Sequence, residues 1–149
     1  MPLALWADFS KIQVGDTASC EVTVTEEDVD AFARLSQDDN ALHMDDSVAR
    51  EYGFPRRVAH GMLALSAISR LIGTQLPGHG ALWLSQDVQF TTPVFVGDTF
   101  EAKVTVQQLS MGAQVVVLST EARNLTTGGV VLRGTAKVRV LPRKSEEQA

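Results

Sequence analysis

The sequence predicts an α+β fold, a single domain in which an antiparallel β-sheet wraps around a long central α-helix. The helix is indicated by the stretch from Gly61 to Ile72, GMLALSAISRLI, which is apolar on nearly every side and therefore needs covering structure. The sheet is indicated by five runs rich in β-branched residues, one before this helix and four after it. With 149 residues, 44% of them hydrophobic, the chain has the size of one domain with a core. We expect this domain to cover residues 14–141, between an N-terminal extension (1–13) and a flexible C-terminal tail (142–149).

Before the central helix, the sequence predicts one strand and two helices. The strand covers residues 18–25 (ASCEVTVT), where β-branched residues partly alternate. Thr25 can then cap a helix that runs to about Leu35, with Asp28 completing a capping box. A second, short helix is expected over residues 46–52. The segment between the two helices is expected to be a loop.

After the central helix, which Gly73 is expected to end, the sequence predicts four strands separated by turn signals. The spacing of the turns suits antiparallel neighbours. In the second strand, four apolar residues share one face, as a strand with one buried side requires. These residues are Phe100, Ala102, Val104 and Val106. The four strands are expected over residues 81–90, 99–109, 113–123 and 129–141.

Composition excludes several classes of protein. A formal net charge of -5 and a pI near 5.1 make the chain a poor binder of nucleic acid, so no such partner is expected. Cys20 is the single cysteine, which excludes an internal disulfide and suits a reducing cytosol. The N-terminal run MPLALW is too short and lacks the basic head of a secretory signal. No stretch approaches the roughly 20 apolar residues that cross a bilayer. We therefore expect a cytoplasmic protein with no membrane contact.

Acid and base groups gather in the segment from Ser36 to His43, SQDDNALH. Asp38 and His43 are five residues apart, which does not place them on one helix face, but in a loop both side chains can turn toward one water molecule. The pair therefore predicts a general acid/base site. A calcium loop, which Asp38-x-Asn40 imitates, is excluded because its sixth position is His43 instead of glycine and its twelfth is Ala49 instead of glutamate. No metal site is expected.

Three separated runs carry a resemblance to a known family. The run from Phe32 to His43, the run VAHGM at residues 58–62 and the run PVFVGD at residues 93–98 resemble, in this order, the MaoC-like (R)-specific enoyl-CoA hydratase family. The similarity covers roughly residues 14–141. It implies a hot-dog fold, in which an antiparallel sheet wraps a long helix, and a homodimer whose two subunits build the active sites.

The resemblance also implies roles for particular residues. Asp38 and His43 match the catalytic aspartate and histidine of the family. Gly61 matches the glycine whose backbone N–H helps to bind the thioester carbonyl. Asn40 matches the motif asparagine, which we expect to shape the loop at the substrate site. Ser69 matches a position near the active site of the family.

Other residues near these motifs have two readings each. His60 and Met62 flank Gly61 and are candidates to line the substrate site, although His60 can equally have a structural role at the start of the helix. Arg56 and Arg57 are candidates to bind coenzyme A phosphates, although adjacent arginines are usually solvated. His79 lies in a glycine-rich turn and is expected to be exposed to solvent.

Two positions depart from the family pattern. Ala41 stands where a proline usually follows the motif asparagine, and Arg57 stands in place of another usual proline. The first change can loosen the catalytic loop and the second can alter the approach to the helix. Neither change removes a reacting group.

The predicted reaction is hydration of a trans-2-enoyl-CoA to the (R)-3-hydroxyacyl-CoA, without metal or redox cofactor, coenzyme A being part of the substrate. Two alternatives stay open: a hot-dog acyl-CoA thioesterase and a non-catalytic acyl-thioester-binding domain, because a fold alone does not guarantee activity. The sequence also leaves open the acyl chain length, the choice between coenzyme A and an acyl carrier protein, and the pathway, whether fatty-acid oxidation or the supply of polyester monomers.

Overall fold

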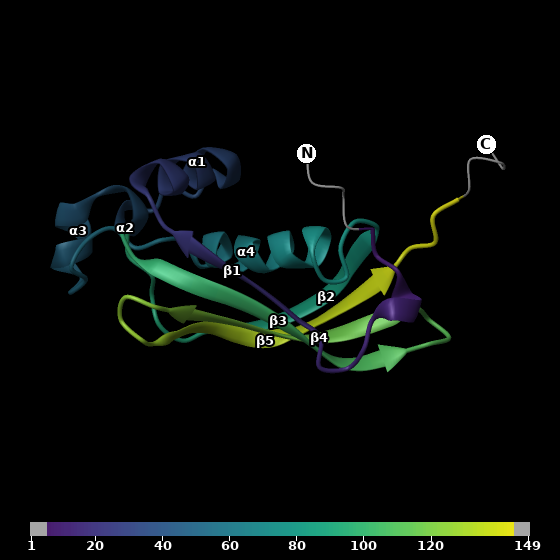
Figure 1. Cartoon of the computed structure of the whole chain (residues 1–149). Coiled ribbons are helices and arrows are strands. Elements are labelled where there is room, and N and C mark those ends of the chain that lie inside the picture. Colours follow the sequence, from purple (N-terminus) through teal and green to yellow (C-terminus); the bar gives the residue numbers. More distant parts are fainter. Residues whose placement is uncertain (1–5, 145–149) are drawn as a thin grey trace.

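A computed structural model describes residues 6–144 of the chain (Figure 1). The described elements are a short 3-10 helix η1 (Phe9–Lys11), β1 (Thr17–Thr23), α1 (Glu26–Ser36), α2 (Ala41–Met44), α3 (Asp46–Glu51), α4 (Gly61–Thr74), β2 (Ala81–Phe90), β3 (Thr99–Ser110), β4 (Val115–Asn124) and β5 (Val130–Val140). None of the helices in this part of the chain is long and apolar enough to cross a membrane.

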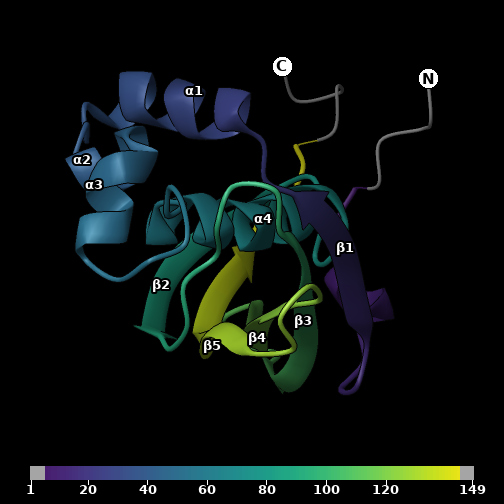
Figure 2. The same ribbon diagram turned by 90° about the vertical axis from the view of Figure 1, so that its left-hand side faces the viewer.

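The five strands form one antiparallel sheet in the order β1-β3-β4-β5-β2. The sheet curves around α4, with strands on both sides of the helix (Figure 2). The helices α1, α2 and α3 lie together over one end of α4, while η1 lies toward the opposite end of the molecule (Figure 1). The predicted architecture, a sheet wrapped around one long helix, is confirmed.

The core forms between α4 and the concave face of the sheet. Ile68 and Leu71 of α4 are fully buried, as are Phe100 and Val104 of β3. The apolar face predicted for β3 is confirmed, because all four of its residues are at most 1% exposed. Full burial of one such side chain stabilises a fold by about 1.5–3 kcal/mol, so a one-residue slip of β3, which would turn this face to solvent, is strongly disfavoured.

The capping box predicted for α1 is confirmed. Thr25 Oγ1 accepts the backbone N–H of Asp28 over 3.1 Å, and Asp28 Oδ2 accepts the N–H of Thr25 over 2.9 Å. The same bonds explain why β1 ends at Thr23, two residues before the predicted end. A residue that caps a helix uses its N–H for the cap and cannot donate it to a strand.

The predicted end of the central helix is wrong. Gly73 lies inside α4, which continues to Thr74. A glycine ends a helix when it adopts the left-handed conformation, and Gly73 does not adopt it. The chain instead leaves the helix two residues later, where the N–H groups of Gln75 and Leu76 both donate to the carbonyl of Leu71 over 2.9 and 2.8 Å.

The N-terminal segment contributes to the fold. Phe9 belongs to the segment predicted as an extension, yet it is 5% exposed and packs into the core. Trp6 pairs with His79 through a parallel bridge, and their rings lie 5.7 Å apart. His79 is therefore half-buried, and the prediction of a solvent-exposed histidine is wrong. Of the predicted flexible tail, residues 145–149 lie outside the described part of the chain.

Candidate active site

The segment between α1 and α3 is built by local side-chain bonds. Gln37 ends α1 in the left-handed conformation, with φ of 60°. Asn40 Oδ1 then accepts the N–H of Leu42 over 3.1 Å and caps α2. His43 thus lies in a one-turn helix, where a loop was predicted. The cap explains why Ala41 can replace proline at the first helical position without loss of the turn.

Asp45 connects this turn to the next helix. Its carboxylate accepts the N–H groups of Ser47 and Val48 and so caps α3. The Ser47 hydroxyl and these N–H groups lower the pKa of Asp45. The charged cap therefore fixes where α2 stops and keeps His43 in its last turn.

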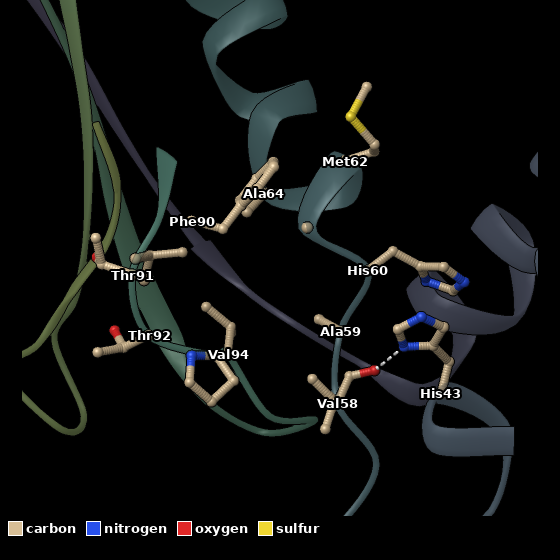
Figure 3. A pocket seen from close by; sticks show the side chains of 13 residues that line it. His43, Val58, Ala59, His60, Met62, Ala64, Phe90, Thr91, Thr92 and Val94 are labelled. Carbon is tan, nitrogen blue, oxygen red and sulfur yellow. Dashed lines mark hydrogen bonds between the residues drawn. The ribbon is translucent and has the colours of Figure 1, made fainter. Parts of the chain in front are cut away.

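The ring of His43 is oriented by a backbone carbonyl. Its Nδ1 lies 2.6 Å from the carbonyl oxygen of Val58, and since a carbonyl can only accept, Nδ1 carries the proton (Figure 3). In the neutral ring, Nε2 is then free to accept a hydrogen bond. This nitrogen lies 3.8 Å from Asp38 Oδ2.

The carboxylate of Asp38 presents one oxygen to His43. Its other oxygen, Oδ1, accepts the N–H of Asn40 over 3.3 Å. The side chain is 53% exposed, so water reaches it. Two acceptors at 3.8 Å are too far apart for a direct hydrogen bond, but one water at about 2.8 Å from each can donate both its protons to them. The spacing of the two acceptors therefore suits one bridging water.

His60 supports this pair from the protein side. It is 2% exposed, and its Nε2–H donates to the backbone carbonyl of Asp38 over 2.9 Å. The ring stacks on His43 with a centroid distance of 3.8 Å (Figure 3), and Phe32 packs against it at 4.8 Å. Of the two readings given to His60, the structure supports both, because the residue braces Asp38 and also lines the adjoining cavity.

A cavity of about 470 Å³ opens beside His43 (Figure 3). Gly61, the first residue of α4, lies in its wall. Within residues 6–144, the backbone N–H groups of Gly61 and Met62 have no hydrogen-bond partner. These N–H groups form the positive end of the helix dipole. Because Gly61 has no side chain, a ligand atom in the cavity has room to approach them. The remaining wall is mainly apolar, formed by Val58, Ala59, Ala64, Phe90, Pro93, Val94 and Val131 together with Thr91 and Thr92.

Residues 11–128 match the family described as MaoC like domain. The chain belongs to this family. It is 40% identical to the (R)-specific enoyl-CoA hydratase of Rhodospirillum rubrum over 132 residues, which cover 89% of this chain and 90% of the relative. It is also 40% identical to the (R)-specific enoyl-CoA hydratase of Aeromonas caviae over 130 residues, 87% of this chain and 96% of the relative.

The solved structure of the (R)-hydratase from Aeromonas caviae matches with a TM-score of 0.85 and 37% identity, covering 88% of this chain and 98% of that one. The recognition of the MaoC-like family and its hot-dog fold from three sequence runs is thus confirmed. The two relatives at 40% identity are named enoyl-CoA hydratases, and the prediction that this chain is an enzyme of the hydro-lyase class is confirmed.

In this MaoC-like domain, three donor side chains lie close enough to suggest a metal site. Donor atoms of Asp38, His43 and His60 are within 4.8 Å of one another. The two histidine rings, however, are stacked with an angle of 30° between their planes. Imidazole lone pairs lie in the ring plane, so those of stacked rings run side by side and do not converge on one ion. The cluster suits a water molecule better than a metal ion.

The two arginines have partners inside the chain. Arg56 donates to the carbonyl of Val96 and to Asp98, a carboxylate that is almost fully buried. The side chain of Arg57 is 9% exposed and donates to Asp30 and to the carbonyl of His43. Arg57 is neither solvated nor free for a phosphate, so both readings of this residue are wrong. Arg56 stays partly exposed, and its contact with coenzyme A remains a prediction.

Ser69 lies apart from the other predicted residues. It is on the exposed side of α4, two turns after Gly61, and does not line the cavity of this chain. Met62 does line it, with a side chain that is 57% exposed. The structure therefore brings together Asp38, His43, His60, Gly61 and Met62, with Asn40 supporting the turn.

Proposed function

We propose that this protein adds water to a trans-2-enoyl-CoA and produces the (R)-3-hydroxyacyl-CoA. The observation that carries the proposal is the 3.8 Å separation of His43 Nε2 and Asp38 Oδ2, two acceptors beside a cavity with unpaired backbone donors at a helix N-terminus. The names of the two relatives at 40% identity support the same reaction.

The first step is addition of water at C3 of the enoyl group. Asp38 and His43 hold the water and take one of its protons as the C3–O bond forms. The π electrons of the C2–C3 bond move toward the thioester and leave negative charge on its carbonyl oxygen. General-base work of this kind commonly contributes about 10²- to 10⁴-fold in rate. The two groups act as one unit, because both contact the same water across a separation of 3.8 Å.

As water adds, the negative charge on the thioester carbonyl oxygen, which makes the intermediate an enolate, has to be stabilised. The N–H of Gly61 is suited to this because it lies in the cavity wall at the positive end of a 14-residue helix. One such donor is worth about 3–4 kcal/mol in the transition state. The enolate then takes the proton back at C2 from the Asp38–His43 pair. Water oxygen and proton arrive from the same side, which gives syn addition.

The cavity has the polarity for an acyl chain. Its wall is mainly apolar, with the two histidines on one side and the hydroxyl groups of Thr91 and Thr92 on the other (Figure 3). The reaction as written needs an acid, a base and an oxyanion donor, so we propose that it uses no metal or redox cofactor. Coenzyme A enters as part of the substrate.

The active form is proposed to be a homodimer. Strand β2 is ten residues long and lies at an edge of the sheet. Its side chains Leu82, Leu84 and Phe90 are 47%, 52% and 50% exposed. A long apolar edge strand pairs readily with another strand. A second copy bound along β2 would also cover Met62 and Phe90, which line the cavity and are half-exposed in one chain.

A matched pair of variants tests the dimer. Leu82→Glu puts a charge on the β2 edge, and Leu125→Glu puts the same charge at a leucine of equal exposure, 47%, in the β4–β5 connection. Sedimentation of the wild type should give the mass of two chains. Leu82→Glu should shift it toward one chain, and Leu125→Glu should not. A dimer that survives Leu82→Glu unchanged would rule out this interface.

The reaction is tested by following the enoyl-thioester absorbance of crotonyl-CoA after addition of the purified protein, with chiral analysis of the product. Loss of the band with formation of the (R)-3-hydroxyacyl-CoA is expected. Release of free thiol would point to a thioesterase. Binding without any change in substrate, also with longer enoyl chains, would point to a non-catalytic domain.

We also propose a place for the protein in the cytoplasm, in fatty-acid metabolism. The single cysteine, Cys20, is part-buried, and burial raises the pKa of its thiol. A chain that depends on no disulfide suits a reducing compartment. Fractionation of the source cells tests this placement.

A further inference from the structure

The one-turn helix α2 depends on contacts from another segment. It has four residues, whereas isolated helices shorter than about 12–15 residues are marginal in water. Its direction therefore has to come from tertiary bonds. The segment Arg57–Val58 supplies three: the Val58 N–H donates to the carbonyl of Leu42 over 3.0 Å, the Val58 carbonyl accepts His43 Nδ1–H over 2.6 Å, and Arg57 Nε donates to the carbonyl of His43 over 2.5 Å.

Arg57 connects all three small helices. Its Nη2 lies 2.5 Å from Asp30 Oδ1 on α1, and its Nε bonds the His43 carbonyl on α2. Its backbone N–H donates to Asp46 Oδ1 at the start of α3 over 2.8 Å. The guanidinium is buried, and a buried cation is tolerated where a carboxylate pairs with it. The ion pair with Asp30 thus keeps the arginine in the position where it can hold His43.

We infer that Arg57 is a positioning residue for His43: its guanidinium, anchored by Asp30, holds the His43 carbonyl and thereby sets the direction of the imidazole toward Asp38. The link rests on the proposed function, in which His43 Nε2 and Asp38 Oδ2 share one water. The carbonyl group and the side chain of His43 are both attached to its Cα, so a displacement of the carbonyl that moves the Cα also moves the imidazole. An error of about 1 Å in such a geometry can cost about 10²-fold in rate.

The chemistry of arginine explains why a lysine would not replace it. Arg57 donates from two different nitrogens of one rigid plane to two separate acceptors. A lysine ammonium is a point charge on a flexible stem, so it satisfies the Asp30 carboxylate and leaves the His43 carbonyl without its bond. The proposal therefore predicts that charge alone is not sufficient.

The test measures kcat and KM on crotonyl-CoA for Arg57→Lys, Arg57→Leu and the exchanged pair Asp30→Arg with Arg57→Asp. Each should lower kcat by about 10- to 100-fold, with KM within about twofold, because the contacts that bind substrate are unchanged. The exchanged pair restores opposite charges but gives His43 no donor. Compared with Arg57→Leu, the exchanged pair should therefore have a higher thermal stability but an equally low kcat. Recovery of kcat by the exchange, or a wild-type kcat in Arg57→Leu, would overturn the proposal.

Arg123→Leu is a control for the loss of one paired arginine, at a side chain that is 48% exposed where that of Arg57 is 9% exposed. Arg123 also donates to one carbonyl, that of Gly128, and to one carboxylate, that of Glu121, both over 3.3 Å, but on β4 and its following turn. Loss of this arginine should leave kcat unchanged. An equal fall of kcat in both leucine variants would mean that any lost arginine acts through general stability.

A second readout separates this inference from the proposed reaction. Nitrogen-15 NMR of the histidine side chains reports which ring nitrogen carries the proton, and His43→Gln assigns the signal. The wild type should show His43 as the Nδ1–H form held by Val58, and Arg57→Leu should show a mixture of forms. If the wild type does not hydrate crotonyl-CoA but this change is seen, the proposed reaction fails and the positioning stands. An unchanged His43 signal in Arg57→Leu would refute the positioning.

Discussion

The buried ring of His60 donates its Nε2–H to the backbone carbonyl of Asp38 over 2.9 Å, across 22 positions of sequence. His60 immediately precedes Gly61, the first residue of α4. One side chain therefore ties the two halves of the proposed chemistry together, the carboxylate that holds water and the N–H that faces the thioester oxygen. The stacked ring of His43 lies on the same imidazole, 3.8 Å away. A displacement of His60 would therefore also displace Asp38, Gly61 and His43.

His60→Phe tests this connection. Phenylalanine keeps a ring between Phe32 and His43 but cannot donate to Asp38. Loss of the bond should lower the free energy of unfolding by about 1–2 kcal/mol and lower kcat together with it. Urea unfolding and kcat on crotonyl-CoA measure the two effects. His79→Phe, at a half-buried histidine near the other end of α4, should leave kcat unchanged. A wild-type kcat in His60→Phe would show that the bond has no part in catalysis.

Asp38→Asn and His43→Ala should each remove most of the turnover while the fold remains. Asp38 is 53% exposed and His43 lies in a short turn, so neither change opens the core. We expect kcat to fall by about 10²- to 10⁴-fold in each variant. Because both residues act on one water, the double variant should be little worse than either single one. Circular dichroism checks the fold. If the reduction of kcat in the double variant equals the product of the two single reductions, the residues act independently.

Much of the fold could be predicted because its elements carry local signals. The alternation from Phe100 to Val106 sets one buried face, and the Thr25–Asp28 capping box marks the start of α1. Both signals depend only on residues that are close in sequence, because side-chain alternation in a strand and capping of a helix are local effects. The sheet and the central helix follow from such patterns. The end of α4 did not follow, because Gly73 is compatible with a helix interior as well as with a stop.

The site could be predicted only in part. Asp38, His43 and Gly61 were found through motifs, but the bonds that orient them join distant segments. Nothing in a single sequence shows that the Val58 carbonyl fixes the tautomer of His43, because a backbone group has no residue signature. Arg57 resembled a solvated arginine, and its burial depends on Asp30, 27 positions earlier. Tertiary packing of this kind decides roles that spacing cannot.

Gly61→Ala should impair catalysis more than stability. A Cβ at this position would lie 3.0–3.3 Å from three atoms of the Phe90 ring. Phe90 is 50% exposed, so its ring can shift at little cost to the fold. The added methyl group would still stand in front of the N–H that faces the cavity. We expect kcat/KM to fall by at least about tenfold, with a change in thermal midpoint of a few degrees.

The double variant Gly61→Ala with Phe90→Ala separates the two possible roles of the glycine. Removal of the ring relieves the contact but leaves the methyl group beside the N–H. Activity should therefore remain low relative to Phe90→Ala alone. Restored activity in the double variant would show that Gly61 serves only close packing against Phe90.

Gly134→Ala should be the most destabilising of these changes. Gly134 on β5 pairs with Val88 of β2 and Thr120 of β4. A Cβ here would stand 1.9 Å from the carbonyl oxygen of Asp87, a backbone atom that cannot turn aside as a side chain can. Strands β2 and β5 would have to separate at this point, which should lower the free energy of unfolding by more than about 4 kcal/mol or prevent folding. Gly112→Ala, where no atom lies within 4 Å of the added Cβ, is the control and should unfold like the wild type.

Since β2 carries the proposed dimer edge, any folded Gly134→Ala should also dissociate at a higher concentration, which sedimentation over a dilution series measures. Wild-type stability in Gly134→Ala would show that β2 and β5 do not approach this closely.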